Sequence, residues 1–203
     1  MNRAELKAMA KEQIRGNIGI LFVVTLVMAL LSGLAAGVLS LIPVVGSIVA
    51  AVVVTPAFAL SMVRIYLALT LYTKPEVKDV FSGFDDFWAA FKVTFLSGLY
   101  IFLWSLLFVI PGIVKTYSYS MAMYVLAENK GMSATECINA SKEMTNGHKM
   151  DLFVLSLSFI GWMMLGSITF GLAYIWVMPY MNATFANAYN SLKPAAAETT
   201  VEA

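Results

Sequence analysis

Three long stretches of the chain contain no charged residue. They run from 16 to 63, from 93 to 114 and from 152 to 192. About 20 apolar residues in helical conformation cross the hydrocarbon core of a bilayer, so each stretch is long enough to cross at least once. The core of a water-soluble protein does not need uncharged runs of this length. The pattern therefore predicts an all-α integral membrane protein.

Turn-forming residues divide these stretches into six predicted transmembrane helices, at about 18–42, 47–71, 93–110, 113–127, 150–168 and 172–192. Pro43 to Gly46 and Pro111-Gly112 separate neighbouring spans, because proline and glycine interrupt helices. The last stretch would form a helix of about 62 Å, which is twice the thickness of the hydrocarbon core, so we expect a turn at Thr169-Phe170-Gly171. The spans form three hairpins in a single membrane domain, residues 1–192, followed by a disordered cytoplasmic tail at 193–203.

Segments of mixed polarity precede the hairpins. Residues 2–15 place Leu6, Ala10 and Ile14 at helical spacing opposite basic side chains. Residues 77–91 combine an aromatic face with an acidic one, which predicts an amphipathic helix lying in the membrane interface. The sequence from Ser133 to Glu136 is a capping box that begins a polar helix, and Asn146-Gly147 is a typical helix end.

The positive charges indicate the orientation. In the six-span arrangement, all of the 13 Lys and Arg except Arg64 and Lys115 lie on one side of the membrane. Cytoplasmic loops carry the excess of Lys and Arg, so both termini and the interfacial helices are expected in the cytoplasm. The first apolar run has 25 residues, whereas the apolar part of a signal peptide has about 7–15, so it is expected to remain as the first span.

Composition agrees with this interpretation. The chain is 60% hydrophobic and 12% charged, against about 25% charged residues in a soluble domain. A net charge of +1 gives no reason to expect a nucleic-acid partner. The single cysteine, Cys137, excludes an intramolecular disulfide and any site built from several cysteines.

The residues that carry chemistry are few. The single histidine, His148, has no clustered acidic partner in the sequence and is expected to be a solvated interfacial residue rather than a metal ligand. Asp85 and Asp86 are adjacent on a helix and therefore do not face each other. We expect no catalytic, cofactor-binding or metal-binding set, and we expect a protein that is not an enzyme.

Several polar side chains fall inside predicted spans. Arg64 lies near the cytoplasmic boundary, where its guanidinium can reach water. The others are Lys115, Tyr117, Ser120 and Tyr124 in the fourth span and Asn182, Thr184, Asn187 and Asn190 in the sixth. They either form hydrogen bonds between helices or line a path for a substrate. Lys115 is the only charge expected in the outer half of the membrane. It either reaches the outer headgroups or lines a crevice between the third, fourth and sixth spans.

Three stretches resemble a known family: LWSLLFVIPGIVKTYSYSMAMYVLAEN from 103 to 129, GHKMDLFVLSLSFIGW from 147 to 162, and VMPYMNATFANAYNSL from 177 to 192. They are similar to bacterial integral membrane proteins known as domain of unknown function 975. The resemblance covers nearly the whole chain up to Lys193. It implies a multi-pass protein of the bacterial cytoplasmic membrane, and it implies no activity and no functional residues.

These observations favour a non-enzymatic protein that works within the lipid bilayer by binding a membrane protein partner or a phospholipid. The alternative is a small transporter or permeability factor with a polar path between the fourth and sixth spans. A membrane enzyme is the third possibility.

Overall fold

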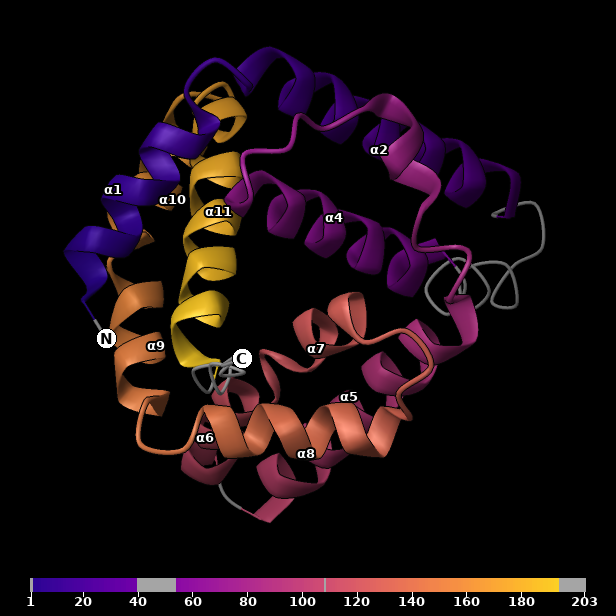
Figure 1. Ribbon diagram of the computed structural model, residues 1–203, viewed down its shortest axis with the longest axis vertical. Helices are drawn as coiled ribbons and strands as arrows, with labels where there is room; N and C mark the ends of the chain where they lie inside the picture. Colours follow the sequence, from indigo (N-terminus) through magenta and orange to yellow (C-terminus); the bar gives the residue numbers. More distant parts are fainter. Residues whose placement is uncertain (1, 40–53, 108, 194–203) are drawn as a thin grey trace, which may run out of the picture.

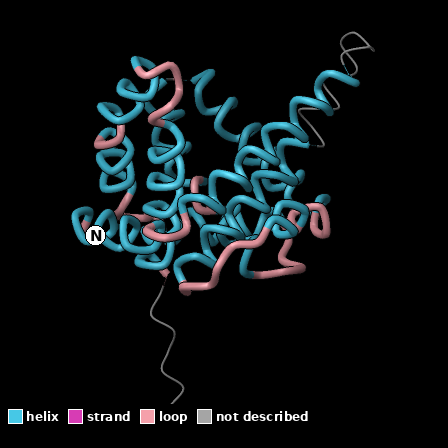
Figure 2. Tube along the Cα trace, turned by 90° about the horizontal axis from the view of Figure 1, so that it is seen from above, coloured by secondary structure: helices cyan, strands magenta, loops and turns pink. Residues whose placement is uncertain are grey.

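The computed structural model describes residues 2–39, 54–107 and 109–193, and in this part of the chain it contains helices and no β-strand. The elements are α1 (Arg3–Ile14), α2 (Ile18–Leu39), α4 (Thr55–Thr70), η2 (Val77–Phe81), α5 (Phe87–Leu107), α6 (Val109–Tyr119), α7 (Ala122–Glu128), α8 (Ala134–Met144), α9 (Lys149–Leu157), α10 (Ile160–Ile168) and α11 (Tyr174–Leu192). The helices surround α4, α7 and α11, which lie toward the middle of the view in Figure 1 and pack on one another. The same helices are seen from above in Figure 2. The predicted all-α class is confirmed.

Three helical segments are long and apolar enough to cross a membrane: Ile18–Val38, Phe87–Leu106 and Lys149–Ile168. They coincide with the first, third and fifth predicted spans. Their large apolar side chains are widely exposed on the protein surface, as Leu34, Phe102 and Ile168 illustrate. The helix α4 is apolar but shorter. The predicted turn from Pro43 to Gly46, part of the second span and the tail after 193 lie outside the described residues.

The predicted interfacial helix over 77–91 is wrong as a single helix. The chain forms the short 3-10 helix η2, then turns, and α5 begins at Phe87. Gly83 explains the interruption, because it approaches α4 so closely that an added Cβ would lie 2.0 Å from the Ala57 carbonyl oxygen. Its backbone N–H donates to the Ser61 hydroxyl at 2.8 Å. The segment is thus fixed to α4, and Phe84 packs edge-on against Phe58 at 5.3 Å between ring centroids.

The fourth predicted span is also corrected. Instead of one helix from 113 to 127, the chain forms α6 and α7 with a break at Ser120-Met121. Pro111 lies in the first turn of α6, where a proline costs no internal helical hydrogen bond. The helices α5 and α6 pack closely against each other. Gly112 allows close contact with Ser105, whose hydroxyl oxygen would lie 2.2 Å from an added Cβ.

Two local predictions are confirmed. Ser133 accepts a hydrogen bond from the backbone N–H of Glu136, whose carboxylate accepts one from the Ser133 N–H, so the capping box begins α8. The expected turn at Thr169 to Gly171 separates α10 from α11, with positive φ angles at Phe170 and Gly171.

The N-terminal helix packs on protein rather than lying on its own at the interface. The apolar face of α1 is buried against α11 and α4, with Leu6, Ala10 and Ile14 almost completely covered. Figure 1 shows α1 beside α11 at the edge of the bundle. The first and the last helix of the described chain therefore pack against each other.

Candidate functional site

The polar residues of the sixth predicted span form hydrogen bonds within the protein. The Asn187 side chain is 2% exposed and forms two hydrogen bonds with the Gln13 side chain, at 3.0 and 2.7 Å. The Asn182 side chain donates to the Met178 carbonyl at 3.0 Å. The Thr184 hydroxyl donates to the Tyr180 carbonyl at 2.7 Å. Of these hydrogen bonds, the Asn187 pair connects α11 to another helix, α1, whereas the Asn182 and Thr184 bonds lie within α11.

Tyr124 and a second tyrosine form the centre of another polar group. Tyr124 stacks on Tyr189, with 5.3 Å between ring centroids. The Tyr189 hydroxyl donates to the Glu128 carboxylate at 2.8 Å, and the same carboxylate pairs with Lys193. Asn190 donates to the Thr70 hydroxyl at 2.9 Å. These residues tie the ends of α4, α7 and α11 together.

A cavity beside this group measures about 470 Å³. It is lined by Arg64, Leu67, Ala68, Thr70, Leu71, Ala127, Glu128, Asn190 and Lys193. Glu128 and Lys193 neutralise each other, and Arg64 pairs with Asp86 and donates to the Ser82 carbonyl. Arg64 thus fixes the turn after η2, which corrects the expectation that its guanidinium extends to water.

Ser120 lies at the break between α6 and α7. The helix α8 supplies hydrogen-bond partners for backbone groups at this break. The Ser120 hydroxyl donates to the Tyr117 carbonyl at 2.9 Å. The Ser141 hydroxyl of α8 donates to the Ser118 carbonyl at 2.8 Å and accepts from the Met121 N–H at 3.2 Å. A buried carbonyl or N–H without a partner is costly. The hydrogen bonds from α8 therefore stabilise the break between α6 and α7.

Lys115 does not join Asn182 in a crevice. Its ammonium lies over the Trp104 ring, 4.6 Å from the centroid, and 5.9 Å from that of Tyr119. The other charges that act on it are the ammonium groups of Lys142 and Lys149, which repel it. Both belong to the segment predicted to be cytoplasmic. Lys115 is therefore not isolated from other charges, and its placement in the outer half of the membrane stays a prediction.

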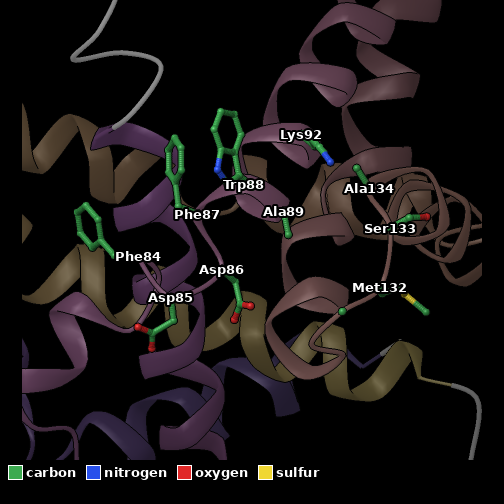
Figure 3. Close-up of a pocket in the computed structure, with 11 residues that line it drawn as sticks. Phe84, Asp85, Asp86, Phe87, Trp88, Ala89, Lys92, Met132, Ser133 and Ala134 are labelled. Carbon is green, nitrogen blue, oxygen red and sulfur yellow. The ribbon is translucent and has the colours of Figure 1, made fainter.

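A cleft of about 650 Å³ lies between the start of α5 and the loop before α8. Figure 3 shows the rings of Phe84, Phe87 and Trp88 on one side and the carboxylates of Asp85 and Asp86 pointing away from them. Because Asp86 is engaged by Arg64, the two carboxylates do not act as a pair. Within the described residues, no group of three His, Cys, Asp or Glu side chains could hold a metal ion.

His148 and Cys137 also have structural surroundings. His148 precedes α9, and its Nδ1 lies 3.1 Å from an Asp151 carboxylate oxygen, so it has the acidic partner that the sequence did not reveal. Cys137 is completely buried in α8, and burial raises the pKa of its thiol to about 11. The reactive thiolate is therefore scarce near neutral pH.

The apolar groove between α6 and α9 has a different character. It measures about 390 Å³ and is lined by Ile110, Ile113, Val114, Tyr117, Lys149, Met150 and Phe153. Tyr117 meets Phe153 edge-on at 5.7 Å between centroids and forms part of the wall. Lys149 is its single charged residue. We call this feature the α6–α9 groove. Of its residues, the sequence singled out Tyr117 alone, since pairing of α6 with α9 has no local signal.

Comparison with known proteins gives a family and no activity. No curated protein and no solved structure matches the chain significantly. The family model described as "Protein of unknown function (DUF975)" matches residues 1–118 and 106–196. Together the two matches cover all of the described residues, including the three stretches that resemble domain of unknown function 975. The chain belongs to the DUF975 family.

Proposed function

We propose that this chain is a multi-pass membrane protein that binds a lipid through the α6–α9 groove. The observation that carries the proposal is the lining of the groove, in which six apolar or aromatic side chains accompany a single lysine. Its volume of about 390 Å³ falls within the range of small-molecule sites, about 300–1,000 Å³. An acyl chain suits such walls, since each buried methylene contributes about 0.8 kcal/mol.

The surroundings of the groove support a ligand that is itself part of the membrane. Ile110 and Met150 are 75% and 68% exposed at its rim. The apolar surfaces of α2, α5 and α10 are similarly open. A lipid can therefore enter the groove sideways from the bilayer without crossing water.

The proposed arrangement has six crossings with both termini in the cytoplasm. The distribution of Lys and Arg supports it, as do the α5–α6 hairpin and the turn before α11. In this arrangement α6 and α7 share the fourth crossing. A cysteine replacing Phe170, which is fully exposed, should react with an impermeant thiol reagent in intact cells. One replacing Ser133 should not react, and labelling of Ser133→Cys from outside would contradict the arrangement.

The transporter alternative requires a continuous polar path, and two of the residues expected to line it are engaged by other residues of the protein. Asn187 is paired with Gln13, and Tyr124 stacks on Tyr189. Solute flux into proteoliposomes that is abolished by Lys115→Met, with folding intact, would favour that alternative instead. Turnover of a substrate by the purified protein would favour an enzyme.

The lipid proposal is tested by native mass spectrometry of the protein purified in mild detergent. Phospholipid should remain bound to the parent protein. The substitution Val114→Trp, which places a large ring in the groove, should remove most of it. The matched control is Leu30→Trp, which adds the same ring at an exposed position of α2, and it should retain the lipid. Equal retention in both variants would exclude the groove as the site, and no retention in the parent would contradict lipid binding.

A further inference from the structure

We infer that the lipid held in the α6–α9 groove is an anionic phospholipid, with its phosphate at Lys149 and with Lys142 and Lys115 around it. This inference rests on the lipid binding proposed above and adds the class of headgroup. It follows from Lys149 in the lining of the groove and from the electrostatic repulsion that Lys149 and Lys142 exert on Lys115.

Lys149 supplies the charge at the groove itself. It is the first residue of α9 and lines the groove together with Met150 and Phe153. Its side chain thus belongs to the same surface as the apolar walls. A ligand that fills the groove with its apolar part brings its polar end within reach of this ammonium group.

Two further lysines strengthen the positive charge there. Lys142, near the end of α8, and Lys149 both act electrostatically on Lys115. Within the described residues, none of the three forms an ion pair with a carboxylate. The nearby Asp151 is hydrogen-bonded to His148. Lys142 and Lys149 both repel Lys115, and an external anion relieves this repulsion.

The position of the groove suits a headgroup as well as a chain. Lys149 stands among the apolar and aromatic residues of α6 and α9 that line the groove. A boundary between polar and apolar surface is where a phospholipid changes from headgroup to acyl chain. Lys149 therefore marks the place of the phosphate.

The test titrates the full-length protein in detergent with phosphatidylglycerol and, separately, with phosphatidylcholine of the same acyl chains. Native mass spectrometry gives the bound fraction of each. The parent protein should bind phosphatidylglycerol more tightly. Lys149→Gln and Lys142→Gln should each weaken that binding roughly five-fold and leave phosphatidylcholine binding unchanged, as expected for loss of one lysine near an anionic lipid.

The matched control is Lys130→Gln, which removes an exposed lysine beyond the opposite end of α8 and should leave the preference intact. If Lys130→Gln weakened phosphatidylglycerol binding as much as Lys149→Gln, the lipid would be attracted nonspecifically to positive charge. That result would overturn the inference. Equal binding of the two lipids by the parent would also overturn it while leaving the lipid proposal standing. Absence of both lipids would contradict the lipid proposal itself. Inorganic phosphate should not displace the lipid. Displacement would show that the apolar groove contributes nothing to lipid binding and would overturn the inference.

Discussion

The amide pair between Gln13 and Asn187 allows a quantitative test of how the bundle is closed. Both side chains are nearly inaccessible, at 3% and 2% exposure, and each donates to the other. Replacing Asn187 by Leu preserves the approximate size of the side chain but leaves the Gln13 amide buried without its partner. An unsatisfied buried polar group costs about 1–3 kcal/mol. Gln13→Met should cost a similar amount for the same reason.

The double variant Gln13→Met with Asn187→Leu should be much less destabilised than the sum of the two single variants. Two apolar side chains of similar shape leave no unpaired group, and such a replacement is nearly neutral. For a protein of this size, a loss of 2 kcal/mol lowers the unfolding midpoint by about 4–8 °C. The double variant should recover most of that shift.

The buried Cys137 provides the assay. A dye that fluoresces on reaction with a thiol reports unfolding during a thermal ramp, because the single cysteine is covered in the folded protein. Asn139→Leu is the control, since Asn139 lies exposed on α8 and its loss should move the midpoint little. Strictly additive shifts in the double variant, or single variants as stable as the parent, would refute the role of the pair.

Three other predictions use the same purified protein. Asp86→Asn should lower the unfolding midpoint by several degrees, because it removes the partner of Arg64, whereas Asp85→Asn should not; equal effects would disprove a specific pair. Gly83→Ala should destabilise strongly, since its Cβ would collide with the backbone of α4, whereas Gly98→Ala enters open space and should be tolerated; tolerance of both would mean that the turn does not contact α4. Cys137 should react slowly with a maleimide at pH 7.5 and faster as the pH approaches 11, the pKa of its thiol; rapid labelling of the folded protein at pH 7.5 would contradict its burial.

The sequence predicted those features that depend on neighbouring residues. Long uncharged runs predicted apolar helices, and the capping box at Ser133 and the turn at Gly171 were located correctly. Each depends on helix composition or on the conformation of a few adjacent residues. The periodicity of 77–91 was misleading, since it gave no sign that Gly83 must lie against α4.

Pairings between distant residues could not be predicted from such patterns. Arg64 and Asp86 are separated by 22 positions, and Gln13 and Asn187 by 174. Periodicity places a residue on one face of its own helix but does not identify the helix that this face meets. The sequence did correctly predict that Asn187 and Thr184 face the interior of the protein. Their expected convergence with Lys115 failed because α6 packs mainly on α5, α8 and α9.

The closure of the bundle by α1 and α11 has a consequence for biosynthesis. Gln13 leaves the ribosome 174 residues before its partner Asn187. At about 5–20 residues per second, α1 waits roughly 10–35 s for the helix that completes its hydrogen bonds. During that interval its apolar face is open to the bilayer surface or to chaperones. A nascent chain that stops before α11 thus exposes the buried face of α1, which gives cellular quality control a means of recognising incomplete copies.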